Sequence, residues 1–177
     1  MTTLKQTHAA IVDSRTMYSK NVHSLDTYAH KALKPSTNKK LGRKVTKGKL
    51  AGMPIYTLTL EERKTCDDAC EHWLDCYGNN MPFAHRIDTA GLEARLETEL
   101  DALDSKHKRG YLVRLHVLGD FYSTDYVKFW QIQVAKRDKL HVYGYSRHHP
   151  GKPVGDALRH ARKVLGFNRF AIRFSTL

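Results

Sequence analysis

From residue 53 onward, short apolar runs alternate with longer segments whose apolar residues recur at helical spacing. These patterns predict strands over residues 53–60, 111–118, 140–145 and 170–175, and helices over residues 89–108, 124–138 and 153–165. Parallel neighbouring strands need a crossover connection, usually a helix, so this alternation favours parallel (βα) repeats. We therefore expect an α/β protein built as a partial TIM-like barrel of about four strands.

A polar cluster follows each predicted strand. The cysteine-bearing segment follows the first strand, residues 119–123 the second, residues 146–149 the third, and Ser175 the fourth. The carboxyl ends of parallel strands share one edge of a sheet, and the functional loops lie at that edge. We therefore expect the four clusters to gather there.

The three cysteines, Cys66, Cys70 and Cys76, lie within eleven residues of a charged loop, with the spacing C-x3-C-x5-C. Thiolates this close in sequence can share one soft metal centre. Zinc would need a fourth ligand, for which His72 is the first candidate and His85 the alternative. An iron–sulfur cluster would use the three thiolates and leave one iron open to an exogenous ligand. The simpler alternative is three reduced cysteines that bind nothing.

The net charge of +12 is unevenly distributed along the chain. Residues 1–50 carry 11 Lys/Arg against 2 Asp/Glu, residues 61–104 carry 4 against 12, and residues 105–177 carry 15 against 4. Basic segments of this kind attract phosphate backbones, although lysines that only keep a surface soluble give the same balance. We expect a basic N-terminal arm, or a helical and loop extension, over residues 1–50. A cysteine-loop (βα) domain would then occupy residues 51–177, and nucleic acid would contact basic residues 31–49 and 147–163.

The sequence also bears on the compartment. It contains no apolar run of about 18 residues, which a membrane-spanning helix needs. The first twenty residues lack the apolar centre of a secretory signal, and an odd number of cysteines fits a reducing environment. We expect a cytoplasmic protein that does not contact membranes.

Several stretches of the sequence resemble the gene product 88 family of phages and plasmids: NKKLGRKVTKG, IYTLTLEERKTCDDAC, DCYGNNM, RLHVLGDFYS and HVYGYSRH. The similarity extends over most of residues 35–177. Members of that family typically continue past the final strand into a further cysteine-bearing segment. The resemblance therefore implies a shortened form. Because the last predicted element is a strand that no helix covers, we expect either a fragment of a larger barrel or a sheet that a partner chain completes.

The order of these elements is also similar to the layout of radical S-adenosylmethionine enzymes. In that family a three-cysteine loop after the first barrel strand holds a 4Fe–4S cluster whose open iron binds S-adenosylmethionine. A Gly-Gly-Glu motif after the second strand and a polar residue after the fourth also contact this cofactor. The resemblance implies that Cys66, Cys70 and Cys76 hold the cluster, and that the cofactor contacts Gly119, Asp120, Ser175, Tyr77 and Arg147.

This sequence departs from the radical S-adenosylmethionine pattern in three respects. The second cysteine gap is wider by three residues, aspartate replaces glutamate at Asp120, and only four strands are predicted where the family has six. Three functions follow as hypotheses. The first is an iron–sulfur enzyme acting on a nucleic-acid or nucleotide substrate, and the second is a zinc-stabilised nucleic-acid-binding module without catalysis. The third is a phage inhibitor that binds a host or rival protein.

Overall fold

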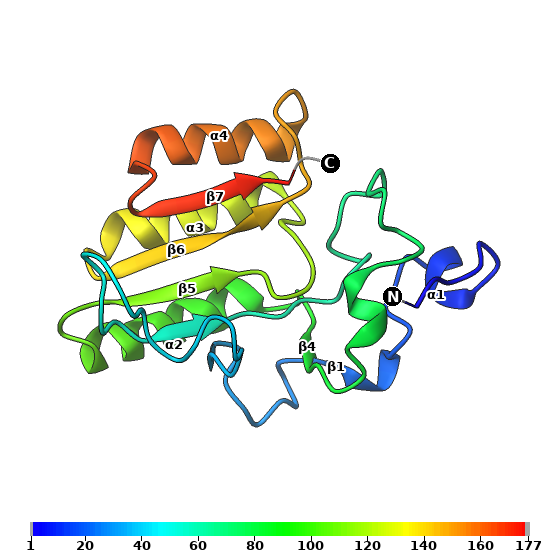
Figure 1. Cartoon of the computed structure of the whole chain (residues 1–177), viewed down its shortest axis with the longest axis horizontal. Helices are drawn as coiled ribbons and strands as arrows, with labels where there is room; N and C mark the ends of the chain where they lie inside the picture. Colours follow the sequence, from blue (N-terminus) through cyan, green and yellow to red (C-terminus); the bar gives the residue numbers. More distant parts are fainter. Residues whose placement is uncertain (1, 176–177) are drawn as a thin grey trace.

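The strands of the main sheet run parallel except at one edge. The computed structural model describes residues 2–175, and Figure 1 shows its mixed α/β fold. The sheet has the order β2-β3-β5-β6-β7, with bounds Lys34–Pro35, Ile55–Thr57, Tyr111–Leu115, Leu140–Ser146 and Phe170–Phe174. β3, β5, β6 and β7 are mutually parallel, which confirms the predicted parallel succession. β2 pairs antiparallel with β3. The sequence pattern did not predict β2.

The helices α2 (Leu92–Lys106), α3 (Thr124–Lys136) and α4 (Pro153–Leu165) connect the parallel strands and lie on one face of the sheet (Figure 1). Local signals set their ends. The Ser123 hydroxyl caps α3 by accepting a hydrogen bond from the Tyr126 amide at 3.0 Å, and Pro153 occupies the first turn of α4. These three helices were predicted, although α2 begins after Gly91, whose φ of +69° is left-handed, and so starts three residues late.

The two faces of the sheet differ in composition because side chains alternate along each strand. Residues on the helix face form the core and include Val113, Leu115, Val142, Phe170 and Ile172. The opposite face carries Arg114, Tyr143, Tyr145 and Arg173, which are partly or fully exposed. Arg114 and Arg173 therefore point away from the helices. Along the described chain, no helix combines the length and the apolar character that crossing a membrane requires.

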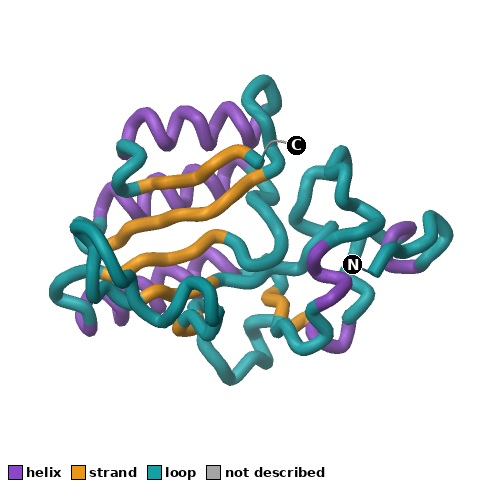
Figure 2. Tube along the Cα trace, in the orientation of Figure 1, coloured by secondary structure: helices purple, strands orange, loops and turns teal. Residues whose placement is uncertain are grey.

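The segment before the sheet packs against the cysteine segment (Figure 2). It contains α1 (Ala9–Val12), η1 (Ser19–Asn21) and β1 (Val22–His23), and β1 pairs in parallel with β4 (Arg86–Ile87). Leu4, Ala10 and Ile11 are buried against Trp73 and Leu74. These contacts attach the start of the predicted basic arm to the rest of the protein. The division between residues 1–50 and 51–177 stays a prediction.

A buried ion pair joins the start of the cysteine segment to β4. Glu62 and Arg86 have side chains 1% and 0% exposed, and the guanidinium donates to the Glu62 carboxylate through Nε at 2.6 Å and Nη2 at 2.9 Å. The remaining Arg86 donors bond to the carbonyls of Gly78, Met81 and Ala84. All five N–H donors of the guanidinium therefore have acceptors, which offsets the cost of burying the charge.

Replacing Arg86 with methionine should lower the free energy of unfolding by roughly 3–5 kcal/mol, because the Glu62 carboxylate would stay buried without a counter-charge. Urea denaturation measures the loss. Arg159→Met is the matched control: its guanidinium, 64% exposed, pairs with Asp156 on the surface of α4. Such surface pairs contribute about 0–1 kcal/mol. Equal losses in the two variants would contradict the importance assigned to the buried pair.

Candidate functional site at the carboxyl edge of the sheet

A pocket of about 290 Å³ lies at the carboxyl ends of the parallel strands. Its lining includes residues from all four polar clusters that follow the strands: Cys66, Cys70, Cys76, Tyr77, Gly119, Asp120, Arg147 and Ser175. The expected gathering of these clusters at one edge is confirmed. Parallel strand direction is the cause, since it delivers every strand-to-helix loop to the same side.

The cysteine loop is held in place by a second buried arginine. Arg63 is 2% exposed and adopts a left-handed φ of +65°. Its guanidinium donates to the carbonyl of Trp73 at 2.9 Å, to the carbonyl of Arg15 at 3.3 Å and to Oδ1 of Asn79 at 2.7 Å. The Cys66 amide in turn donates to the Arg63 carbonyl at 3.2 Å. Arg63 thus holds Trp73, within the cysteine loop, and Asn79, after it, close to the N-terminal segment.

The thiols themselves are partly exposed to the pocket. Burial raises the pKa of Cys66 well above its ordinary value, and the nearby Asp120 carboxylate raises it further. Burial also raises the pKa of Cys76. A thiol with a raised pKa stays protonated at neutral pH and is a weak nucleophile. The raised pKa values therefore disfavour Cys66 and Cys76 as nucleophiles, whereas a bound metal would deprotonate a coordinating thiol.

Asp120 links the loop after β5 to the loop after β6. Its carboxylate accepts hydrogen bonds from the Phe121 amide at 2.7 Å and from the Arg147 amide at 2.8 Å. The residue is only 4% exposed, and burial raises the pKa of the carboxyl group although these hydrogen bonds oppose the change. An acidic group in this position suits a ligand that brings positive charge into the pocket.

Gly119 lets the loop after β5 lie against the residues that precede the cysteines. Its φ is +80°, and an added Cβ would lie 2.5 Å from Oγ1 of Thr65 and 2.7 Å from Cβ of Leu60. The same Thr65 hydroxyl accepts a hydrogen bond from the Asp120 amide at 3.2 Å and donates to the Glu61 carbonyl at 2.8 Å. Both the backbone conformation and the lack of a side chain are therefore required at this position.

The loop after β6 contacts the cysteine segment through charges. Arg147 Nη2 lies 3.0 Å from the Glu71 carboxylate, and Lys152 Nζ lies 3.0 Å from that of Asp67. His148 Nδ1 is 3.5 Å from the same Asp67. Part of the basic segment 147–163 is therefore paired with acids of the cysteine segment. The prediction that this segment contacts nucleic acid stays untested.

Ser175 and Tyr77 lie at the rim of the pocket. The Ser175 amide donates to the Ser146 carbonyl at 2.8 Å, which extends the pairing of β7 with β6. The Ser175 carbonyl lies 3.5 Å from Nη1 of Arg147. Tyr77 is 58% exposed and precedes the turn in which Gly78 contacts Glu62. The rim therefore combines a hydroxyl, a guanidinium and an aromatic ring.

His116 lines the pocket and was not among the predicted site residues. It follows β5, is 7% exposed, and its Nε2 lies 3.2 Å from the Tyr126 hydroxyl. Its Nδ1 is buried without a hydrogen-bond partner among residues 2–175. Burial lowers the pKa of His116 to about 3, so the ring is neutral. The only sequence signal was a polar residue within an apolar strand.

The two histidines considered as zinc ligands lie outside this pocket. His72 has a side chain 60% exposed, and its Nδ1 lies 3.1 Å from the Asp75 carboxylate. His85 stacks on His23 with ring centroids 4.8 Å apart, and it lines the pockets beside β2. Within the described part of the chain, no group of three or more His, Cys, Asp or Glu side chains is positioned to hold a metal ion.

Comparison with known proteins identifies a family. A family model described as gene product 88 matches residues 30–156, which include the three cysteines, Gly119, Asp120 and Arg147. Neither the curated proteins nor the solved structures gave a match to this chain.

Gly119→Ala should destabilise the protein more than Gly48→Ala, although both glycines have a φ of +80°. The left-handed conformation should cost each variant about 1 kcal/mol. Only Gly119 has neighbours that an added Cβ would meet, because nothing lies within 4 Å of that position at Gly48. The steric conflict should add about 1–3 kcal/mol, measured by urea denaturation. Equal losses would mean that the Thr65 and Leu60 side chains move aside without cost.

Stability should fall as the pH falls below about 6.5, because the unfolded chain protonates His116 there while the folded chain keeps it neutral. The loss should continue toward pH 3, where the folded residue titrates, with a slope of at most about 1.4 kcal/mol per pH unit. His116→Leu should make the pH dependence shallower by this contribution. Urea denaturation of both proteins across this pH range provides the comparison. Identical slopes would show that the folded ring binds protons as readily as the unfolded one.

Proposed function

The chain belongs to the gene product 88 family, and we propose that it is a phage-type iron–sulfur protein, a radical S-adenosylmethionine-like enzyme with a nucleic-acid or nucleotide substrate. Cys66, Cys70 and Cys76 would hold a 4Fe–4S cluster. S-adenosylmethionine would bind next to the cluster, beside Gly119 and Asp120, where the loop after β5 forms the pocket wall.

The observation that carries this proposal is the single pocket that contains all three thiols, an acidic group and the ends of the strands. Its position at the carboxyl edge is where (βα) folds place their chemistry. β3, β5, β6 and β7 neighbour one another in chain order, with α2, α3 and α4 on one face. This order would suit the open part of a TIM-like barrel, whose remaining strands a partner chain could supply.

A 4Fe–4S cluster would use the three thiolates, whereas a single zinc ion would need a fourth donor. Mononuclear zinc needs four donors around one point, at about 2.3 Å for sulfur, and residues 2–175 hold no group of even three suitable side chains positioned around one ion. A cluster spreads its thiolate ligands over several iron atoms, so they stand further apart. When bound, a cluster with S-adenosylmethionine supplies one-electron reductive chemistry.

The side chains around the thiols have roles that follow from their charges. The Asp120 carboxylate accepts two main-chain hydrogen bonds and keeps further acceptor capacity, so it would bind an ammonium group. Arg147 would bind a ligand carboxylate by exchanging its ion pair with Glu71, since a guanidinium presents a planar pair of donors. Ser175 would add a hydroxyl, and Tyr77 would cover the ligand with its exposed ring. His116 Nδ1, which is buried and unpartnered within the described chain, would hydrogen-bond to a ligand group inside the pocket.

A non-enzymatic nucleic-acid-binding module is the second candidate. Basic side chains along the pockets beside β2 favour it, because they would contact phosphates whether or not a reaction takes place. A structural zinc ion would contribute less to the free energy of folding here than in a small zinc domain, because hydrogen bonds from Arg63 and Arg86 already hold the cysteine loop. The metal content of the protein distinguishes the two candidates.

Protein purified without oxygen should contain about four iron and four sulfide per chain and should absorb visible light. Cys76→Ser should lose the iron and the colour, because it removes one of the three thiolates. His72→Ala is the matched control in the same segment and should keep both, since its side chain points into solvent. One zinc per chain without colour, lost in His72→Ala, would overturn the proposal in favour of the zinc module.

A further inference from the structure

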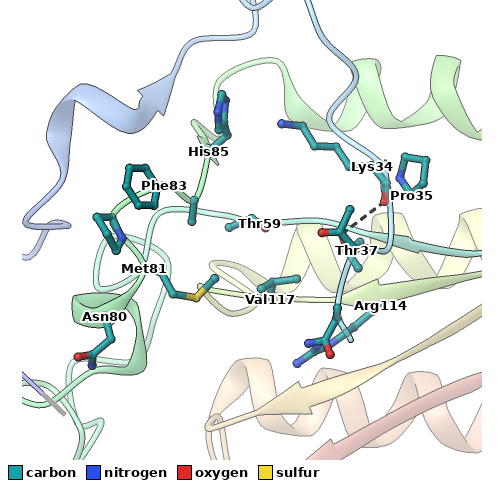
Figure 3. Close-up of a pocket in the computed structure, with 14 residues that line it drawn as sticks. Lys34, Pro35, Thr37, Thr59, Asn80, Met81, Phe83, His85, Arg114 and Val117 are labelled. Carbon is teal, nitrogen blue, oxygen red and sulfur yellow. Dashed lines mark hydrogen bonds between the residues drawn. The ribbon is translucent and has the colours of Figure 1, made fainter. Parts of the chain in front are cut away.

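A larger pocket of about 510 Å³ lies on the sheet face opposite the helices. Figure 3 shows Phe83 and Met81 on one side of it and Lys34, Thr37 and Arg114 on the other. Thr59 and Val117 lie between the two sides. Arg114 and Val117 also line the pocket that contains the thiols. The two pockets therefore adjoin through the end of β5, and a ligand in the larger one would lie next to the candidate site.

The lining of this larger pocket contains no acidic residue. A third pocket, of about 660 Å³, shares its wall at Lys34 and His85 and also contains no acidic residue. It adds Lys31, Arg43 and Lys106 to the basic side chains. Unlike the cations of the loop after β6, those named here form no ion pair with any residue among 2–175. The two pockets thus form one continuous basic surface, which suits a polyanion.

Arg114 is the central cation of this surface. It lies in register with Thr57 on β3 and Tyr143 on β6, on the face of the sheet that the helices leave uncovered. Its guanidinium is partly buried, yet no hydrogen bond or ion pair joins it to another side chain or carbonyl in the described chain. Arg86, by contrast, uses all five donors. A partly buried guanidinium with unused donors suits a phosphate group, which it can bind through two parallel hydrogen bonds.

An aromatic ring stands beside the basic surface. Phe83 is 90% exposed, the highest value among the exposed large apolar side chains of the described chain. An exposed phenylalanine ring has no polar group that bonds to water, but a nucleobase can stack on its face. A pocket of about 510 Å³ also falls within the size range of small-ligand sites. It can therefore admit a single nucleotide unit, and an unpaired base has a free face for the Phe83 ring, whereas the bases of a duplex are covered by their stacked neighbours.

We propose that this surface binds single-stranded nucleic acid, with one phosphate at Arg114 and the adjacent base stacked on Phe83. Lys34 contacts the next phosphate and directs the strand toward Lys31 and Arg43. Because Arg114 also lines the pocket that contains the thiols, the nucleotide bound there is the one presented for modification, and this last step rests on the proposed function. Binding itself does not require the cluster.

The test is fluorescence anisotropy with short fluorescein-labelled oligothymidylate and oligouridylate, and with a DNA duplex of the same length, at several salt concentrations. Both single strands should bind more tightly than the duplex, and a preference between them identifies the substrate as DNA or RNA. Phe83→Ala should weaken binding roughly 5- to 100-fold through loss of stacking. Arg114→Gln and Lys34→Gln should each weaken binding and reduce the salt slope by about one.

Two variants on other parts of the surface serve as controls. Lys128→Gln removes the same charge as Lys34→Gln from an exposed position on α3, and Phe167→Ala removes a ring 45% exposed beyond α4. Both should bind like the wild type. The proposal is overturned if the duplex binds as tightly as the single strands, or if Lys128→Gln and Lys34→Gln have equal effects. No binding of any oligonucleotide would overturn it as well.

The same measurement separates this inference from the proposed function. Oligothymidylate binding should not depend on the iron content of the protein, since the thiols lie in the other pocket. Wild-type protein that binds single strands but contains no iron would overturn the proposed function and leave the binding surface supported. Protein that contains the cluster but binds no single strand would overturn the binding surface and leave the proposed iron–sulfur function supported.

Discussion

The buried ion pair between Glu62 and Arg86 is the interaction on which the candidate site depends. It joins the segment between β3 and the first cysteine to β4, and the remaining donors of Arg86 hold the turn that follows Cys76. The pairing requires Gly78, because a Cβ there would lie 2.5 Å from the Glu62 carboxylate. Thr16 donates to the same carboxylate at 2.7 Å and so attaches the N-terminal segment. Burying these charges is expensive unless every donor and acceptor is used, so the surrounding backbone has little freedom to move.

This network explains how a segment poor in regular structure can present a defined pocket. Between β3 and α2 the chain forms only short elements, yet Glu62, Arg63 and Arg86 are buried and hydrogen-bonded. The thiols are thereby held against the loop after β5, where Asp120 contributes a carboxylate with a raised pKa. The pocket is lined by two acids, Glu62 and Asp120, and by two guanidinium groups, those of Arg114 and Arg147. The adjoining surface around Arg114 contains no acidic residue and suits a polyanion, whereas the pocket with the thiols combines charges of both signs.

Much of the site could be predicted because it follows from the order of elements. Parallel strands deliver their loops to one edge, so Cys66, Gly119, Arg147 and Ser175 meet although they are far apart in the sequence. The histidines could not be assigned in this way. His72 and His85 lie close to the cysteines in sequence, but the loop turns them away from the pocket. His116 was missed because strand alternation does not show which face is covered, and the irregular backbone after β5 directs its ring toward α3.

By itself the sequence determined the α/β class, the parallel strand succession, the positions of the helices and the edge at which the polar clusters meet. These features follow from hydrophobic periodicity, capping residues and glycines, which act over a few residues. Tertiary structure alone decided which charges are paired and which remain available. Arg86 and Arg114 are the same residue type in apolar surroundings, yet one is fully bonded in the interior and the other faces an open pocket. That difference depends on which carboxylates and carbonyls the fold brings within reach, and no local pattern contains this information.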